Sequence, residues 1–175
     1  MKFHTSVLSL LLTLTLPSTL AQSPVDNALA QFRTLNDRID AVQSSIDGYS
    51  GGLSGVVLAL PVANSLYSAH TAASTARTSL SALDPLSPAD SQRALDAYNE
   101  VHPRLIRALN AGRDKAAVFK DVGVGYVAQG MISNLYNEKN RFEEALRAKV
   151  YPGYFQNDLA EAVDAAFQDT LARFS

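Results

Sequence analysis

Few residues of this sequence could do catalytic chemistry, and their spacing matches no known catalytic motif. The 175-residue chain contains no Cys, which excludes disulfides, thiolate metal sites and cysteine nucleophiles. Beyond the N-terminal segment only His70 and His102 remain as histidines, and neither has a second His four residues away. No His-Glu-x-x-His motif, EF-hand spacing or Gly-x-Ser-x-Gly elbow occurs. We therefore expect neither a bound metal nor nucleophilic hydrolysis.

Glycines near the middle of the chain have part of the spacing of a phosphate-binding loop. Gly123 and Gly125 are followed by another Gly only at Gly130, which is not the dinucleotide-binding fingerprint. The interval from Gly125 to Gly130 fits a phosphate loop, but Met131-Ile132 occupies the positions of the required Lys and Ser/Thr. We interpret these residues as helix-start and packing glycines and expect no cofactor.

The charged residues favour neither a polyanionic partner nor catalysis. Fifteen Lys and Arg against seventeen Asp and Glu give a net charge of -2. Because no basic excess exists to neutralise phosphates, nucleic acid is not an expected partner. Glu143-Glu144 and the pair Asp37/Asp40 are most simply solvated helix faces. Paired carboxylates for glycoside hydrolysis stay open from sequence alone, although nothing favours them. We expect a protein that is not an enzyme.

The elements that would position these residues are helices. Hydrophobic residues make up 47% of the chain and charged residues 18%, a composition typical of one globular domain. Five segments carry apolar residues at gaps of three and four, and no window alternates with the period of a strand. These patterns predict an all-α fold, a single bundle of about five amphipathic helices without disulfides.

Capping residues, Gly and Pro predict where the helices begin and end. The expected helices run from Ser23-Pro24 to Gly48, from Gly55 to Asp84, from Ser87 to Gly112, from Gly125 towards Pro152, and from Asn157 or Asp158 to Phe174. Pro61 is expected either to kink the second helix or to mark its true start, and Pro103 to bend the third. Residues 115–121 are expected to form a short polar connector.

The first twenty-one residues have the features of a secretory signal peptide. Lys2 precedes an apolar run from Val7 to Leu16, and Thr19-Leu20-Ala21 places small residues at the -3 and -1 positions of a cleavage site. The run is too short to span a bilayer of roughly 30 Å. We expect residues 1–21 to be removed and residues 22–175 to form one secreted, extracellular domain with no transmembrane segment.

Large residues on the apolar stripes are candidates to line a ligand site, because helical bundles build such sites between their helices. The same residues would equally form a filled core, and periodicity does not distinguish the two. Helices bent by proline spread their neighbours apart, which favours an opening for a long acyl chain. The candidate lipid-binding residues are Leu35, Ile39, Val42, Leu66, Leu105, Leu109, Met131, Leu135, Phe142 and Leu146.

Four segments carry a resemblance to one protein family. They are residues 46–52 (IDGYSGG), 115–123 (KAAVFKDVG), 142–150 (FEEALRAKV) and 165–175 (AAFQDTLARFS). Together with the signal-peptide start, their order and spacing are similar to those of the fungal hydrophobic surface-binding protein A family, also called the antigenic cell-wall galactomannoproteins. The resemblance covers essentially all of residues 22–175.

The resemblance implies a secreted helical protein that binds apolar matter without catalysis. Family members adsorb to hydrophobic surfaces, where one role is to recruit secreted polyester hydrolases such as an esterase or cutinase. Some members hold long-chain fatty acids between their helices, and others sit in the cell wall as mannoproteins. The chain lacks the Ser/Thr-rich tail of some wall-associated members, which argues against heavy O-mannosylation and covalent retention in the wall.

Three hypotheses follow for the function. The first is a non-catalytic binder of hydrophobic surfaces or long-chain fatty acids. The alternative is a structural or antigenic cell-wall mannoprotein without a small ligand, which would share the fold but have a filled interior. The third is an enzyme, or a helical enzyme inhibitor like those of invertase and pectin methylesterase, which rely on disulfides that this chain cannot form.

Overall fold

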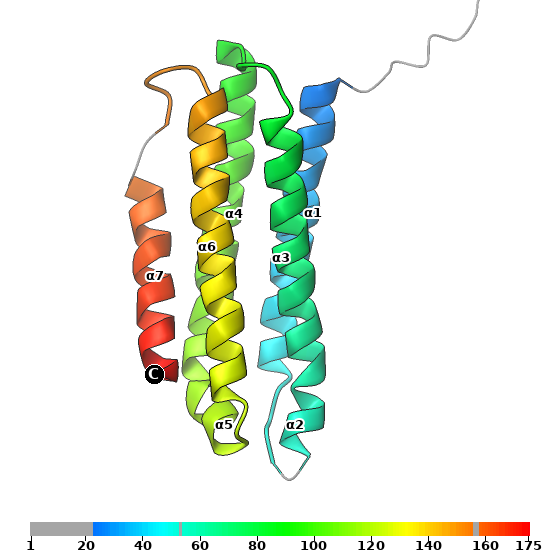
Figure 1. Ribbon diagram of the computed structural model, residues 1–175, viewed down its shortest axis with the longest axis vertical. Helices are drawn as coiled ribbons and strands as arrows, with labels where there is room; N and C mark the ends of the chain where they lie inside the picture. Colours follow the sequence, from blue (N-terminus) through cyan, green and yellow to red (C-terminus); the bar gives the residue numbers. More distant parts are fainter. Residues whose placement is uncertain (1–22, 53, 156–157) are drawn as a thin grey trace, which may run out of the picture.

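Five long helices and two short ones make up the structure, a computed structural model that describes residues 23–52, 54–155 and 158–175 (Figure 1). The helices are α1 (Pro24–Asp47), α2 (Gly55–Leu58), α3 (Leu60–Ser81), α4 (Pro88–Asp114), α5 (Ala116–Asp121), α6 (Gly125–Lys149) and α7 (Asp158–Phe174). The described residues contain no strand. The predicted all-α bundle is therefore confirmed. The expected signal peptide, its cleavage site and the alternative cap Asn157 lie outside the described residues.

Serine caps set the starts of α1 and α4. The Ser23 hydroxyl accepts a hydrogen bond from the Asp26 backbone N–H, and the Ser87 hydroxyl accepts one from the Asp90 N–H, both at 3.1 Å. Proline occupies the first turn of both helices, where its missing N–H leaves no intrahelical bond unmade. Both predicted helix starts are confirmed.

The predicted end of the third helix at Gly112 is wrong, and so is the connector predicted at residues 115–121. The helix continues to Asp114 because Gly112 is a packing position: a Cβ there would meet Ile46 Cδ1 at 3.8 Å and Thr170 Cγ2 at 3.9 Å. Residues 116–121 form α5 because Phe119 is buried and stacks on Tyr49 with ring centroids 4.4 Å apart. Tertiary contact here outweighs the polar local sequence.

The two interior prolines behave differently. Pro61 marks a true helix start, since α3 begins at Leu60 with the proline in its first turn. Pro103 lies inside α4, which continues past it. Both Pro103 and Asn99, whose carbonyl loses its usual helical N–H partner, are exposed, so water can hydrate that carbonyl.

The long helices run up and down and close into a ring. Helix α1 packs against α3 and α4, α4 packs against α7, α7 against α6, and α6 against α3. The order around the ring is therefore α3, α1, α4, α7, α6. In Figure 1 the connections at α2 and α5 lie at the lower end of the bundle, and the α3–α4 and α6–α7 connections lie at the upper end. Each helix presents its apolar stripe to a common axis.

Replacing Ser87 with Ala should destabilise the domain by about 1 kcal/mol, because it leaves the Asp90 N–H without its capping acceptor. The midpoint of urea unfolding, followed by circular dichroism, measures this change. Ser81→Ala, at an exposed hydroxyl that makes no hydrogen bond within the described part of the chain, is the matched control. Equal stabilities of the two variants would contradict the capping role.

Candidate functional site

An apolar cavity of about 90 Å³ follows the axis of the bundle. All five long helices contribute side chains to its wall, and α5 contributes Phe119. Along α4 the wall extends from Tyr98 to Gly112, a rise of about 21 Å at 1.5 Å per residue. The cavity is therefore narrow and elongated, a shape that suits an unbranched chain rather than a compact ligand.

Eight of the ten candidate lipid-binding residues lie in the cavity wall. They are Leu35, Ile39, Val42, Leu66, Leu105, Leu109, Leu135 and Phe142. Met131 and Leu146 do not line the cavity. On α6 the lining positions are Ala128, Ile132, Leu135, Lys139 and Phe142, a stripe with gaps of four, three, four and three. Met131 is half-buried beside that stripe, and Leu146 is fully buried in the core one turn beyond Phe142.

The ten candidates omitted seven large apolar lining residues, namely Ile46, Val62, Val101, Phe119, Ile132, Phe167 and Phe174. They also omitted two other kinds of lining residue. The first kind is small: Ala69, Ala73, Ala108, Ala128 and Gly112 line the wall, and their size leaves the space open. The second kind is polar and comprises Tyr98, His102, Lys139 and Thr170. Helical spacing was the signal that could have found both kinds, since each of these residues lies three or four positions from another lining residue.

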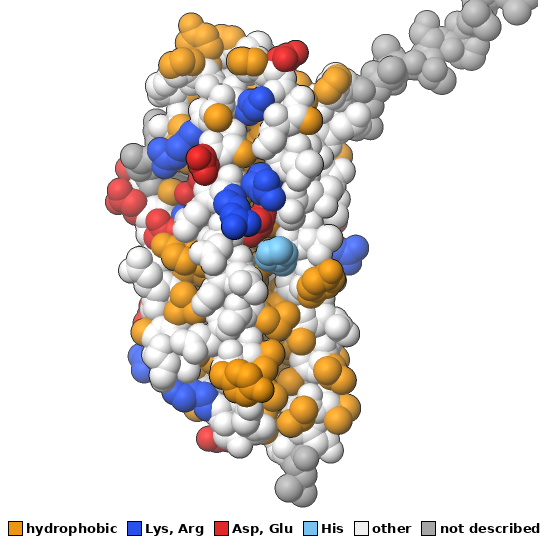
Figure 2. All heavy atoms as spheres, in the orientation of Figure 1, with side chains coloured by type: hydrophobic (Ala, Val, Ile, Leu, Met, Phe, Trp, Pro, Cys, Tyr) orange, Lys and Arg blue, Asp and Glu red, His pale blue; other side chains and the backbone are white. Residues whose placement is uncertain are grey.

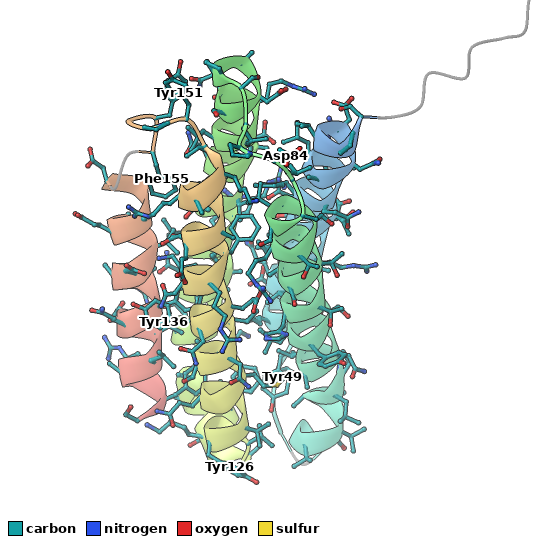
Figure 3. All side chains as sticks on the ribbon, turned by 45° about the horizontal axis from the view of Figure 1, so that its top comes forward. Tyr49, Asp84, Tyr126, Tyr136, Tyr151 and Phe155 are labelled. Atoms are coloured by element: carbon teal, nitrogen blue, oxygen red, sulfur yellow. The ribbon has the colours of Figure 1, made fainter. Side chains whose placement is uncertain are left out.

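Aromatic rings cluster at both ends of the cavity. At the upper end Phe142 lies between Phe32 and Tyr98, with ring centroids 5.1 Å and 5.9 Å away, and Phe155 extends this layer beyond Tyr98. At the lower end Phe119 lies between Tyr49, at 4.4 Å, and Phe174, at 6.1 Å. Figure 3 shows Tyr49 in the lower part of the bundle and Phe155 in its upper part.

A buried polar cluster lies beside the upper aromatic layer and includes Glu143, so the prediction that Glu143 lies on a solvated helix face is wrong. The Tyr98 hydroxyl donates a hydrogen bond to Glu143, and Lys139 Nζ lies 2.9 Å from the same Glu143 carboxylate oxygen, Oε1. Lys139 also pairs with Asp164 of α7. Burial raises the pKa of Tyr98, and the hydrogen bond to Glu143 raises it further, so the hydroxyl keeps its proton. The cluster thus joins α4, α6 and α7.

His102 is buried at the cavity wall, and neither of its ring nitrogens has a hydrogen-bond partner among the described residues. The residue is 3% exposed, and its ring meets that of Tyr98 edge-on at 4.2 Å. Burial lowers the pKa of His102 to about 4, and the positive charge of Lys139 contributes to the shift. A neutral imidazole without partners costs about 1–3 kcal/mol in lost hydration. Asn36 Oδ1, next to the lining residue Leu35, is likewise buried and unpaired.

A second apolar feature lies on the surface at the lower end. The exposed hydrophobic residues there are Val56, Val57 and Leu58 of α2, Leu60 of α3, and Tyr126 and Val127 of α6. We call this set the lower apolar surface. Figure 2 shows hydrophobic side chains gathered over the lower part of the molecule, where α2 and the first turns of α3 and α6 lie. Val57 is 65% exposed and Tyr126 is 76% exposed. Single exposed apolar side chains are common on proteins, whereas a group of them at one place often marks an interaction site.

Other types of site find little support in the described part of the chain. No three His, Cys, Asp or Glu side chains among residues 23–52, 54–155 and 158–175 lie close enough to hold a metal ion. None of the described helices combines the length and the apolar character needed to cross a membrane.

His102 should make the stability of the domain depend on pH. Its pKa of about 4 lies below the usual value of about 6.5, so between these values the unfolded chain binds a proton that the folded chain does not. Lowering the pH from 7 to 4.5 should therefore remove about 2–3 kcal/mol of stability, measured by urea unfolding. His102→Gln should lack this component, whereas His70→Gln, at the half-buried histidine of α3, should keep it. If the stability of the His102 variant depended on pH as that of the wild type does, His102 would not be the source of this pH dependence.

Comparison with known proteins places the chain in a family. The model of the family described as hydrophobic surface binding protein A matches residues 25–148. No curated protein shows a significant match. The crystal structure of AFMP4P in complex with palmitic acid has a TM-score of 0.80 at 21% identity and covers 86% of this chain and 99% of its own.

Two ligand-binding domains of Penicillium marneffei MP1 share the fold. Domain 1, complexed with arachidonic acids, has a TM-score of 0.77 at 16% identity, covering 87% of this chain and 99% of its own. Domain 2, complexed with multiple arachidonic acids, has a TM-score of 0.73 at 14% identity, covering 87% and 94%. The family match over residues 25–148 confirms the resemblance found in the sequence: the chain belongs to the hydrophobic surface binding protein A family.

Proposed function

We propose that this protein is a secreted, non-catalytic binder of long-chain fatty acids, with the acyl chain lying along the bundle axis. The elongated apolar cavity, lined by every long helix, is the observation that supports this function best. Structures of the same fold hold palmitic acid in AFMP4P and arachidonic acids in MP1, which supports the choice of ligand class. The alternative of a mannoprotein with a filled core would need no such cavity.

The cavity must widen to take a whole acyl chain. Its volume of about 90 Å³ is smaller than the roughly 150 Å³ of a cavity that holds one benzene ring. Burying ten methylenes would contribute about 8 kcal/mol before the costs of association, which is enough to offset outward movement of lining side chains. Half-buried Leu105 and Leu135, which reach towards the surface, are the lining residues that can move with least loss of packing.

The absence of catalysis and the secreted location are parts of the same proposal. The titratable residues that line the cavity, Tyr98, His102 and Lys139, lack the nucleophile and the paired general base that hydrolysis requires. The N-terminal pattern around Lys2, Val7–Leu16 and Ala21 supports secretion. The family resemblance also predicts retention in the cell wall and recruitment of a secreted esterase or cutinase.

A second activity, adsorption to hydrophobic surfaces, is favoured by the lower apolar surface. Val56, Val57 and Leu58 stand exposed in succession on the four-residue helix α2. Six large apolar side chains at one end of a bundle form a patch of the kind that marks an interaction site. Covering each of them fully would contribute about 1.5–3 kcal/mol. We propose that the protein attaches to apolar surfaces by this end.

Filling the cavity should weaken fatty-acid binding. Leu135→Phe places a larger ring in the wall and should lower the affinity for palmitate at least tenfold, measured by calorimetric titration of delipidated protein. Leu171→Phe, the same change at a half-buried position outside the cavity, is the control and should bind as the wild type does. Mass spectrometry of lipids extracted from the purified protein gives an independent measure. If no lipid is recovered and wild type fails to bind palmitate, the fatty-acid proposal is wrong.

Charges on α2 should reduce adsorption. The double variant Val57→Asp/Leu58→Asp should shift the adsorption isotherm on a hydrophobic resin to at least tenfold higher concentration, because two hydrated carboxylates replace side chains that would contact the resin. Tyr151→Asp/Tyr154→Asp adds the same charge at exposed aromatic residues of the α6–α7 connection, at the upper end. Equal loss in both variants would point to general charge repulsion and refute the lower apolar surface as the contact.

A further inference from the structure

His102 is the one polar group of the cavity wall whose hydrogen-bonding capacity is wholly unused in the described structure. Tyr98 donates to Glu143, Lys139 pairs with two carboxylates, and the Thr170 hydroxyl donates to the Leu109 and Ala166 carbonyls. Both His102 nitrogens are buried without a partner. A neutral imidazole carries one acceptor nitrogen and one N–H donor. His102 can therefore accept or donate a bond to a ligand in the cavity.

Burial in the apolar cavity disfavours a bare carboxylate beside His102. From α6, Lys139 faces this end of the cavity, and its single positive charge already pairs with Glu143 and with Asp164 of α7. The charge of Arg147 also acts on Tyr98, so the two cations and two carboxylates of this group sum to zero.

Lys139 is the only cation among the described residues that line the cavity; Arg147 of α6 lies outside the wall, with its guanidinium 4.0 Å from the Phe155 ring centroid. The α1 residues that line the cavity (Leu35, Ile39, Val42 and Ile46) are uncharged, and Asp40 pairs with Arg104 of α4 at part-exposed positions. Glu138 of α6 pairs with Arg77 of α3 at 2.6 Å. An ionised headgroup would thus add a buried negative charge beside Lys139, which already pairs with two carboxylates.

We propose that His102 receives the headgroup of the bound fatty acid and that binding takes up one proton, which the carboxyl oxygen and a His102 nitrogen share. The inference rests on the proposed fatty-acid binding. It adds the residue that contacts the headgroup, the orientation of the acyl chain and the protonation state of the complex. The headgroup lies beside Tyr98 and Lys139, and the acyl chain points down the axis towards Phe119 and Phe174.

The number of protons taken up follows from the protonation states of the free fatty acid and of unliganded His102. An alkyl carboxylic acid, like a Glu side chain, is ionised above about pH 5, and burial together with Lys139 keeps unliganded His102 neutral at pH 7. The N–H of a neutral imidazole could bind a carboxylate without proton uptake, but that complex would hold an uncompensated negative charge in a buried apolar site. We therefore expect the complex to take one proton from solution. Whether it resides on oxygen or nitrogen, the net charge of the ligand–His102 pair is zero.

Proton uptake can be measured directly with the wild-type protein. Calorimetric titration with palmitate, below its aggregation concentration and in buffers of different ionisation enthalpy at pH 7.5, should give close to one proton per ligand. The affinity should accordingly fall about tenfold for each unit of pH above 7. Hexadecanol, which has the same chain and no acid group, should bind without proton uptake.

Two variants test whether His102 holds the proton. His102→Gln keeps a hydrogen-bonding amide but does not titrate, so proton uptake should vanish and the palmitate affinity at pH 7 should fall towards that of hexadecanol. His70→Gln is the matched control and should retain uptake. Should the His102 variant fail to fold, nitrogen-15 NMR of the wild-type His102 ring, assigned with the His70 variant, should show a new hydrogen-bonded nitrogen with palmitate.

The outcomes separate this inference from the proposed function. Palmitate binding without proton uptake, or with uptake that survives in His102→Gln, would overturn the His102 contact and leave fatty-acid binding intact. Failure of both palmitate and hexadecanol to bind would overturn the proposed function and this inference with it.

Discussion

The closed ring of five helices is the constraint on which the rest of the structure depends. Two helices in contact fill the space between them with interdigitated side chains, but five helices around one axis also enclose a central space that no pairwise contact fills. Helices α4 and α6 are not neighbours in this ring, and the Tyr98 side chain of α4 reaches Glu143 of α6. The cavity is thus a consequence of the number of helices.

Charged pairs hold the side of the ring formed by α6. Arg77 of α3 pairs with Glu138, and Asp164 of α7 pairs with Lys139, so adjacent residues of α6 bind its two neighbours. Glu138 and Lys139 are almost fully buried, and taking such charges out of water offsets much of the attraction between partners. The pairs therefore contribute more to fixing the axial position of α6 than to net stability. That position places Lys139 at the cavity wall.

The sequence predicted the helices better than it predicted the wall of the cavity. Capping by Ser23 and Ser87 depends on residues within one turn, so local sequence was sufficient to predict both helix starts. Phe119 and Gly112 were misread because their conformations depend on Tyr49, Ile46 and Thr170, which are distant in sequence. Large residues suggested a lining, and eight of ten reach the wall. The small and polar lining residues escaped because hydrophobicity does not identify the residues that leave space or those that remain unpaired.

An aromatic pair links the start of α2 to the cavity wall. Tyr49 donates a hydrogen bond to the Gly55 carbonyl at the start of α2 and stacks on Phe119, which lines the cavity.

Gly51 and Gly55 bring this segment so close to Val118 and Val122 that a Cβ at either glycine would collide with a valine methyl. Gly51 also has a φ of 69°, which side-chain-bearing residues rarely adopt. The two glycines thus position α2 where its exposed residues adjoin the end of the cavity away from His102. The proposed surface attachment and the proposed acyl-chain site therefore meet at the apolar end of one axis, and the polar cluster lies beyond it.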